Sequence, residues 1–182
     1  MKRWFWVIVA LQMLFLAAEV ATKEISVRTA DTVILKTEPI DPRSLFAGNY
    51  IWLNYDVSTV QLSRTTIPKS KWRRLDSGMV VYAKLAKAKP WARLIDVTTD
   101  RPSKAEPGIV YLRGRLWNLS PGQLRMDYGL DRYYIPENKA DEVAKLQRWS
   151  RKSPVTTVEV AVTGSGQAMI KQVLVDGKPL GF

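Results

Sequence analysis

Apolar and polar positions divide the chain into an uncharged apolar run near its start and a longer remainder in which they alternate. Residues 4–18 carry no charge, and the apolar character continues to residue 21. A short basic start followed by such a run is typical of a signal peptide or a signal anchor. The run approaches the ~20 apolar residues that a membrane-spanning helix needs, and Leu16 is too large for a cleavage site after Ala18. We therefore expect an uncleaved transmembrane helix in residues 1–22, rather than a cleaved signal peptide, and a separate domain in residues 23–182.

The basic residues at the start predict how this helix is oriented. Lys2 and Arg3 precede the apolar run, and positively charged flanks stay in the cytoplasm. The expected topology is a single pass through the inner (cytoplasmic) membrane of a bacterium, with the N-terminus cytoplasmic and the C-terminal domain in the periplasm.

The remainder of the chain predicts short strands separated by turn residues. The strand-forming stretches alternate apolar and polar residues and are rich in Val, Ile, Thr and aromatic residues. They cover residues 24–37, 50–57, 79–86, 91–99, 109–119, 124–135, 155–163 and 168–176. The first has a break predicted at Ala30-Asp31. Two pairs of stretches, joined by KAKP and by GSGQ, predict hairpins.

The stretch 50–57 has one apolar face and one mixed face, because side chains alternate along a strand. The face expected to point into the core carries Ile51, Leu53, Tyr55 and Val57. The mixed face carries Tyr50, Trp52, Asn54 and Asp56. Before this stretch, Asp41 and Pro42 predict the start of one helical turn, and Gly48 predicts its end.

One amphipathic helix is predicted in residues 138–152. Asn138 can cap its first turn, with Asp141 three residues later, and Pro154 ends it. The expected fold is mainly β: an antiparallel curled sheet, barrel-like or a sandwich, with this helix packed on it and a transmembrane helix at the N-terminus.

The composition excludes several kinds of chemistry. The chain has no cysteine and no histidine, so it forms no disulfide and has no thiolate, no imidazole ligand and no serine–histidine–aspartate arrangement. No tight acidic cluster indicates a site for oxygen-bound metal ions, so we expect neither a metal nor a cofactor.

Two enzymatic alternatives remain, and we expect neither. A serine–lysine hydrolase could use Ser44 with one of three lysines, Lys69, Lys71 or Lys84. The Ser-Met-x-Pro element of such enzymes is absent, however. A glycoside-cleaving carboxylate pair could come from four acids whose spacing nothing fixes. These acids are Asp56, Asp127, Asp131 and Glu137.

The positive charge is concentrated in one segment. The formal net charge is +11, and residues 64–93 carry nine basic residues and one acidic residue. Such a segment predicts contact with anionic lipid headgroups or an acidic protein face, or else a solvated surface. Nucleic acid, for which Trp72 and Trp91 could supply stacking, is not expected as a partner of an exported domain. The candidate patch comprises Arg64, Lys69, Lys71, Trp72, Arg73, Arg74, Lys84, Lys87 and Lys89.

Two sequence blocks carry a family resemblance. The first, DPRSLFAGNYIWLNY, contains the string Gly48-Asn49-Tyr50-Ile51-Trp52-Leu53-Asn54-Tyr55, and the second is YGLDRYYIPE, residues 128–137. With the preceding VILKTEPIDPR and the order of elements, they resemble the GDYXXLXY proteins, a bacterial family named for the first string. The resemblance covers most of the chain. It implies a membrane-anchored, non-cytoplasmic protein of a kind often found with multi-pass membrane proteins.

The blocks are interpreted as structural because Asn49 stands where the family usually has Asp. A catalytic base or metal ligand would need the carboxylate, whereas Asn serves equally well in a turn. Arg132 is expected to pair with Asp127 or Asp131. The motif residues are Asp41, Pro42, Arg43, Gly48, Asn49, Tyr50, Leu53 and Tyr55 in the first block, and Tyr128, Gly129, Arg132, Tyr134, Pro136 and Glu137 in the second.

Two functions are compatible with these observations. The first is a non-catalytic accessory subunit, in which the anchored β domain docks on integral membrane proteins of a larger complex and touches lipid headgroups. The alternative is a periplasmic ligand-binding domain for cell-envelope polymers or small anionic ligands, which requires an exposed Trp52. Its binding face would carry Tyr50, Trp52, Tyr128, Tyr133 and Tyr134.

Overall fold

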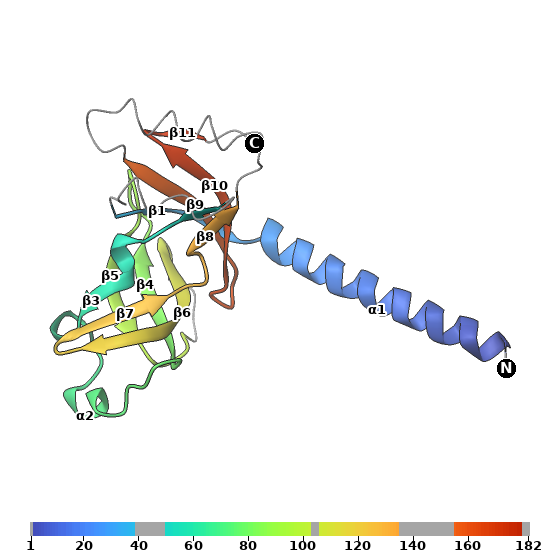
Figure 1. The fold of residues 1–182 in the computed structure, drawn as a ribbon, viewed down its shortest axis with the longest axis horizontal. Helices are drawn as coiled ribbons and strands as arrows, with labels where there is room; N and C mark the ends of the chain where they lie inside the picture. The colour runs from blue at the N-terminus through green and yellow to red at the C-terminus, as the bar shows by residue number, and fades with distance from the viewer. Residues whose placement is uncertain (1, 39–49, 103–105, 135–154, 180–182) are drawn as a thin grey trace.

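The structure, a computed structural model, describes residues 2–38, 50–102, 106–134 and 155–179 (Figure 1). The helical elements are α1 (Lys2–Arg28), α2 (Lys69–Trp72) and two 3-10 turns, η1 (Asp56–Ser58) and η2 (Leu62–Arg64). The strands are β1 (Asp31–Lys36), β2 (Tyr50–Trp52), β3 (Thr59–Gln61), β4 (Val80–Ala86), β5 (Arg93–Thr98), β6 (Ile109–Ser120), β7 (Gln123–Asp127), β8 (Arg132–Tyr134), β9 (Thr156–Val162), β10 (Ala168–Val175) and β11 (Lys178–Pro179). The expected mainly β fold with an N-terminal apolar helix is confirmed.

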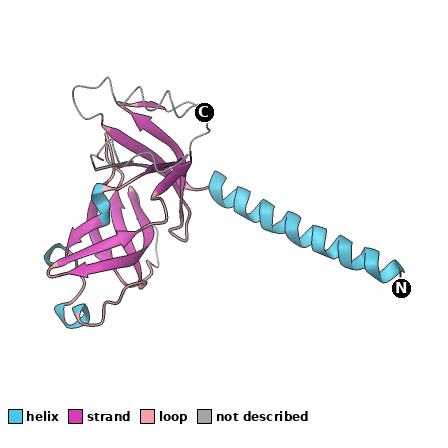
Figure 2. Cartoon of the chain, in the orientation of Figure 1, coloured by secondary structure: helices cyan, strands magenta, loops and turns pink. Residues whose placement is uncertain are grey.

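Helix α1 projects from the β domain as a single long rod (Figures 1 and 2). Its segment Trp4–Thr22 is long and apolar enough to cross a membrane. The apolar side chains point outward: Trp4 is 74% exposed and Leu11 is 69% exposed. This helix therefore buries its apolar surface against nothing in the described chain, as a single-pass anchor would.

The strand predicted from residue 24 is wrong at its start, because the helix continues to Arg28 and β1 begins at Asp31. Local contacts explain the extension. Glu24 and Arg28 form an ion pair one helical turn apart at 2.9 Å, and the Thr29 hydroxyl donates to the Ile25 carbonyl. The helix ends just before the predicted break at Ala30-Asp31.

The strands form two larger antiparallel sheets and one short ribbon. One sheet has the order β1-β9-β10-β11, and the second has the order β3-β7-β6-β4-β5 and curls into a half-barrel. Strands β2 and β8 pair with each other. The predicted hairpins are present, because β4 pairs with β5 and β9 pairs with β10.

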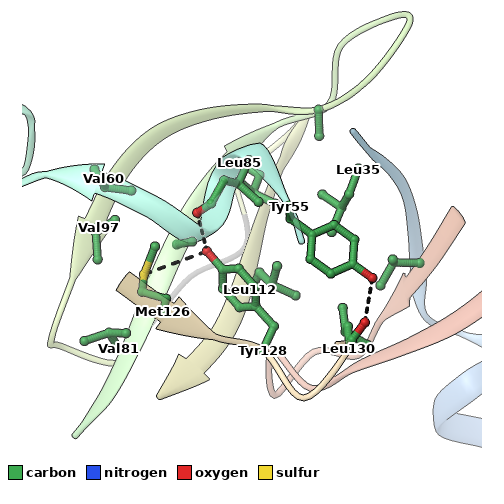
Figure 3. Close-up of a cluster of buried hydrophobic side chains, with 14 of the residues drawn as sticks. Leu35, Tyr55, Val60, Val81, Leu85, Val97, Leu112, Met126, Tyr128 and Leu130 are labelled. Atoms are coloured by element: carbon green, nitrogen blue, oxygen red, sulfur yellow. Dashed lines mark hydrogen bonds between the residues drawn. The ribbon is translucent and has the colours of Figure 1, made fainter. Parts of the chain in front are cut away.

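One apolar core fills the space between the sheets (Figure 3). It combines Leu35 and Val158 of the four-stranded sheet with Leu85 and Leu112 of the five-stranded sheet, all fully buried. The core thus joins the two sheets into one body.

The inward face predicted for residues 50–57 is confirmed where the structure describes side chains. Leu53, Tyr55 and Val57 are 1%, 3% and 3% exposed. Regular strand geometry ends at Trp52, and the chain continues through an isolated bridge between Tyr55 and Thr37 into η1.

The single strand predicted over 124–135 is wrong, because the chain breaks between β7 and β8. Gly129 has a φ of +70°, a conformation that glycine adopts without strain. The Asp127 carboxylate accepts a hydrogen bond from the Gly129 N–H at 2.7 Å, which stabilises the turn. This turn moves the chain from the five-stranded sheet to the ribbon with β2.

Two predicted elements lie outside the described residues: the helical turn at 41–48 and the amphipathic helix at 138–152. The pattern of the sequence also did not predict the short elements β3, β11, η1, η2 and α2.

Candidate functional site

The ribbon of β2 and β8 brings the two sequence blocks side by side. Tyr50 pairs with Tyr134 and Trp52 with Arg132, about 80 residues apart along the chain. The Leu53 N–H then donates to the Asp131 carbonyl at 2.8 Å, which extends the pairing past the ribbon. We call residues 50–57 together with residues 128–134 the motif clasp.

On the inner side of the clasp, two buried tyrosines each form a hydrogen bond to the other block (Figure 3). Tyr55 of the first block donates its hydroxyl to the Leu130 carbonyl of the second block at 2.8 Å. Tyr128 of the second block donates its hydroxyl to the Val57 carbonyl of the first block, also at 2.8 Å. Each block thus supplies one donor and one acceptor, and four polar groups are satisfied inside an apolar core.

The electrostatics keep both tyrosines protonated. Burial raises the pKa of Tyr55, and the nearby Asp131 charge raises it further. Burial also raises the pKa of Tyr128, with a smaller contribution from Asp56. The hydroxyls therefore remain hydrogen-bond donors throughout the physiological pH range.

The Tyr128 ring lies directly against Gly114 of β6. A Cβ atom added at Gly114 would lie 2.9 Å from Tyr128 Cδ1 and 3.0 Å from the Asp127 carbonyl oxygen. Real Cβ atoms do not approach that closely, so the glycine is required by the position of the ring.

The outer side of the clasp forms a groove of about 340 Å³. On one wall, Trp52 is 37% exposed, and the guanidinium of Arg132 lies 5.2 Å from the centre of its ring. Asp131 holds that guanidinium, with its carboxylate 3.3 Å from Arg132 Nε. Of the two ion pairs expected for Arg132, the structure therefore has the one with Asp131.

Strands β6 and β7 form the opposite wall of the groove. Trp117 is 66% exposed and lines the groove, as does Arg125, whose guanidinium donates to the Asn54 side-chain oxygen at 3.2 Å. Sequence analysis missed the role of Trp117 and Arg125. The available signal was a large aromatic residue on the outward side of a strand whose inward positions are apolar.

The aromatic face predicted for ligand binding is only partly present. Trp52 and Tyr134 are exposed and Tyr133 is half-buried, whereas Tyr128 is buried in the core. The prediction for Tyr128 is wrong because this residue, which precedes the turn at Gly129, continues the inward alternation of Leu124 and Met126 in β7. Tyr50 takes part in the ribbon, and its side chain lies outside the described positions, as do Asp41, Pro42, Arg43, Gly48, Asn49, Pro136 and Glu137.

The predicted basic patch is divided into two groups, one around α2 and one on and after β4. Arg64 ends η2, and α2 with the residues after it carries four more exposed cations: Lys69, Lys71, Arg73 and Arg74. We call these five residues the α2 cluster. Trp72 does not offer a stacking face there, because it is half-buried and its indole N–H donates to the Ile67 carbonyl at 2.9 Å.

The lysines on and after β4 lie elsewhere and are paired with acids. Lys84 Nζ is 2.7 Å from a Glu106 carboxylate oxygen, and Lys87 Nζ is 2.5 Å from Asp31, beside the junction with α1. Lys89 follows in the same connection. The hydrogen bond to Glu106 raises the pKa of Lys84, which is opposite to what a lysine general base requires.

The described residues contain no group of three or more acidic residues that could hold a metal ion. Ser44 and Glu137 lie outside the described positions, so the structure does not place the candidate serine nucleophile. Of the other candidate acids, Asp127 and Asp131 line the same groove.

The comparisons with known proteins identify a family. No curated protein and no solved structure matched this chain. The family model described as GDYXXLXY protein matches residues 12–173, which include both blocks of the motif clasp. In the string that names this family, Leu53 and Tyr55 are buried in the core although both also border the groove, whereas Trp52 and Asn54 are exposed along it. The chain therefore belongs to the GDYXXLXY family.

Proposed function

We propose that this protein is a non-catalytic accessory subunit of a larger membrane complex. Helix α1 crosses the inner membrane once, with the N-terminus in the cytoplasm, and the β domain docks on integral membrane partners from the periplasmic side. The observation that carries the proposal is the direct junction between an exposed apolar helix and the folded domain. Only Thr29 and Ala30 separate the end of α1 from the start of β1, so the domain stays at the membrane surface.

The face of the domain beside α1 supports contact with lipid headgroups. Val20 and Thr22, at the end of the candidate span, line one groove together with Arg113, Arg115 and the half-exposed Met169. Side chains at the depth of Thr22 are placed where headgroups begin, and arginines there attract anionic lipids. Two acids also line this groove, but Glu24 is paired with Arg28 and Asp127 accepts a hydrogen bond from the Gly129 N–H. We therefore place the headgroup contact at Arg113 and Arg115 and not along the whole segment 64–93.

The α2 cluster supports contact with an acidic protein face. Within the described part of the chain, Lys71 has a single ion-pair partner, Asp100 at 3.8 Å, and the other four cations have none. Figure 1 places α2 at the end of the half-barrel away from the junction with α1. A partner that binds there must extend beyond the membrane surface, and its acidic groups would be drawn to the surplus positive charge.

Co-purification of the full chain from membranes in a mild detergent tests the docking. We expect integral membrane proteins to be recovered with the wild-type chain and to be lost when three residues of the α2 cluster are replaced, Lys69→Gln, Lys71→Gln and Arg73→Gln. A matched control removes the same charge from exposed residues elsewhere, Arg93→Gln, Arg101→Gln and Lys178→Gln, and should retain the partners. Recovery of the wild-type chain alone, or equal behaviour of the two variants, would contradict the proposal.

The topology has a separate test, because the chain has no native cysteine. In cells with a permeabilised outer membrane, a membrane-impermeant maleimide should label Lys178→Cys and leave Lys2→Cys unlabelled until the inner membrane is opened. The reverse labelling pattern would place the domain in the cytoplasm.

A further inference from the structure

We propose that the groove on the outer side of the motif clasp binds a neutral carbohydrate chain. This inference is independent of the docking function, because it concerns different residues from those of the α2 cluster. It starts from two tryptophans, Trp52 and Trp117, which come from different strands and line the same groove. Large exposed aromatic residues gathered in one concave surface are typical of recognition sites.

Trp117 is placed in the groove by an irregularity of its strand. The pairing of β6 with β7 shifts between Leu116 and Asn118, so that Trp117 has no partner on β7. Such a bulge redirects a side chain and is common beside binding sites. The Ser77 hydroxyl donates to the Trp117 carbonyl at 3.0 Å, and the Gly78 N–H donates to the Leu116 carbonyl at 2.7 Å. The bulged residue is therefore held in place before any ligand arrives.

Trp52 is held equally well on the opposite wall. It pairs with Arg132 in the ribbon, and the following residue is bonded to the Asp131 carbonyl. The indole rings of Trp117 and of Trp52, beside the Arg132 guanidinium, offer flat apolar surfaces, and the apolar C–H face of a sugar ring packs against such a surface. Because pairing and hydrogen bonds already hold the backbone at both positions, binding does not have to order the strands that carry the rings.

The polar groups of the groove match hydroxyl groups in particular. Arg125 and Arg132 are donors, whereas the Asn54 side-chain oxygen and the Asp131 carboxylate are acceptors, and they lie together in the lining. A sugar hydroxyl both donates and accepts, so it can pair with either kind of group. A proline-rich peptide presents mainly carbonyl acceptors and would leave the carboxylate facing another acceptor.

The charge of the lining favours a neutral ligand. Two arginines, Arg125 and Arg132, are balanced by two carboxylates, Asp127 and Asp131. A polyanion would face these carboxylates, and a polycation would face the arginines. The volume of about 340 Å³ suits a short segment of a chain, and the exposure of Trp117 leaves room for the chain to continue beyond the groove.

Binding is tested with the full chain in lipid nanodiscs, because glycoside detergents would themselves compete for the groove. The probes are three neutral tetrasaccharides, chitotetraose, cellotetraose and maltotetraose, titrated by calorimetry beside an oligogalacturonate and a proline-rich peptide. We expect at least one neutral tetrasaccharide to bind. We expect its affinity to fall by roughly tenfold or more in Trp52→Ala and in Trp117→Ala.

The controls separate stacking from folding. Trp91→Ala removes a half-buried tryptophan outside the groove and should leave the affinity unchanged, whereas Trp117→Phe keeps an aromatic face and should restore part of it. Trp117→Ala should still co-purify with membrane partners. Binding of none of the tetrasaccharides at millimolar concentration, preferential binding of the peptide or of the oligogalacturonate, or full affinity in Trp117→Ala would each overturn the proposal.

Discussion

The inner and outer sides of the motif clasp share the same two stretches of chain but differ in burial and polarity, and strands β6 and β7 complete the outer side. On the inner side, Tyr55 and Tyr128 are buried, and each donates its hydroxyl to a carbonyl of the other block. On the outer side, Trp52 and Trp117 are exposed beside charged groups that line a groove. Because successive side chains point to opposite faces of the chain, neighbouring residues contribute either to the core or to the groove.

This contrast suggests how a family motif can be structural and still support recognition. Leu53 and Tyr55 of the family string are buried and hydrogen-bonded to the second block, whereas Trp52 and Asn54 are exposed along the groove. The consequences for stability should therefore fall mostly on the inner side.

The largest effect is expected for Leu53→Ala. Leu53 is 1% exposed, so its truncation leaves a cavity in the core and should lower the free energy of unfolding by about 2–5 kcal/mol. The neighbouring Asn54→Ala, on the outer side, should change it by no more than about 0.5 kcal/mol. Urea unfolding of the full chain in detergent, followed by near-UV circular dichroism, measures both. Equal losses in the two variants would remove the distinction between the sides.

Gly114→Ala should have the next largest effect. The new Cβ would meet the Tyr128 ring at 2.9 Å, and that ring is held by its bond to Val57, so a loss of about 1–3 kcal/mol is expected. Gly164→Ala is the matched control, because nothing lies within 4 Å of the added atom there. In a Tyr128→Ala background the cost of Gly114→Ala should shrink, since the two residues are in contact.

Much of the inner side could be predicted from the sequence. Alternation in residues 50–57 assigned Leu53, Tyr55 and Val57 to the core, and turn residues located both hairpins, because these features depend on local chain geometry. Tyr128 was misplaced because it was grouped with the exposed aromatic residues beyond the turn at Gly129, although it continues the inward alternation of Leu124 and Met126 before that turn.

The outer side depends on contacts between residues that are distant in sequence, and the order of apolar and polar residues does not predict such contacts. The bulge at Trp117 arises from how β6 pairs with β7. The basic segment is divided because Glu106 and Asp31, distant in sequence, neutralise Lys84 and Lys87. Counting charges along the chain cannot reveal which carboxylates the fold brings near.

Alkaline pH should weaken the inner side selectively. Because the pKa of both tyrosines is raised above the ordinary value near 10, the unfolded chain loses protons that the folded chain keeps. Their stabilisation is therefore complete below about pH 10 and declines as pH rises further, by up to about 1.4 kcal/mol per pH unit for each tyrosine. Unfolding measured between about pH 9 and pH 11 should show this slope in the wild type and a shallower slope in the Tyr55→Phe/Tyr128→Phe double variant.

At neutral pH, each single phenylalanine variant should cost less than the changes above. Tyr55→Phe removes the donor to the Leu130 carbonyl, and Tyr128→Phe removes the donor to the Val57 carbonyl, with an expected loss of about 0.5–1.5 kcal/mol each. The rings remain, so packing is preserved. A loss as large as that of Leu53→Ala would mean that leaving a buried carbonyl without a donor costs more than the net contribution of the hydrogen bond itself.

The smallest change in stability is expected for Trp117→Ala, although it removes the largest side chain of the series. Trp117 is 66% exposed, so its truncation uncovers little apolar surface that the fold had buried, and the free energy of unfolding should move by no more than about 0.5 kcal/mol. A residue on a bulge is also already outside the ladder, so the strand pairing should persist. A loss above about 1 kcal/mol would show that Trp117 contributes to packing, as the inner residues do. The exposed tryptophan would then no longer support the view that the outer side is a recognition surface.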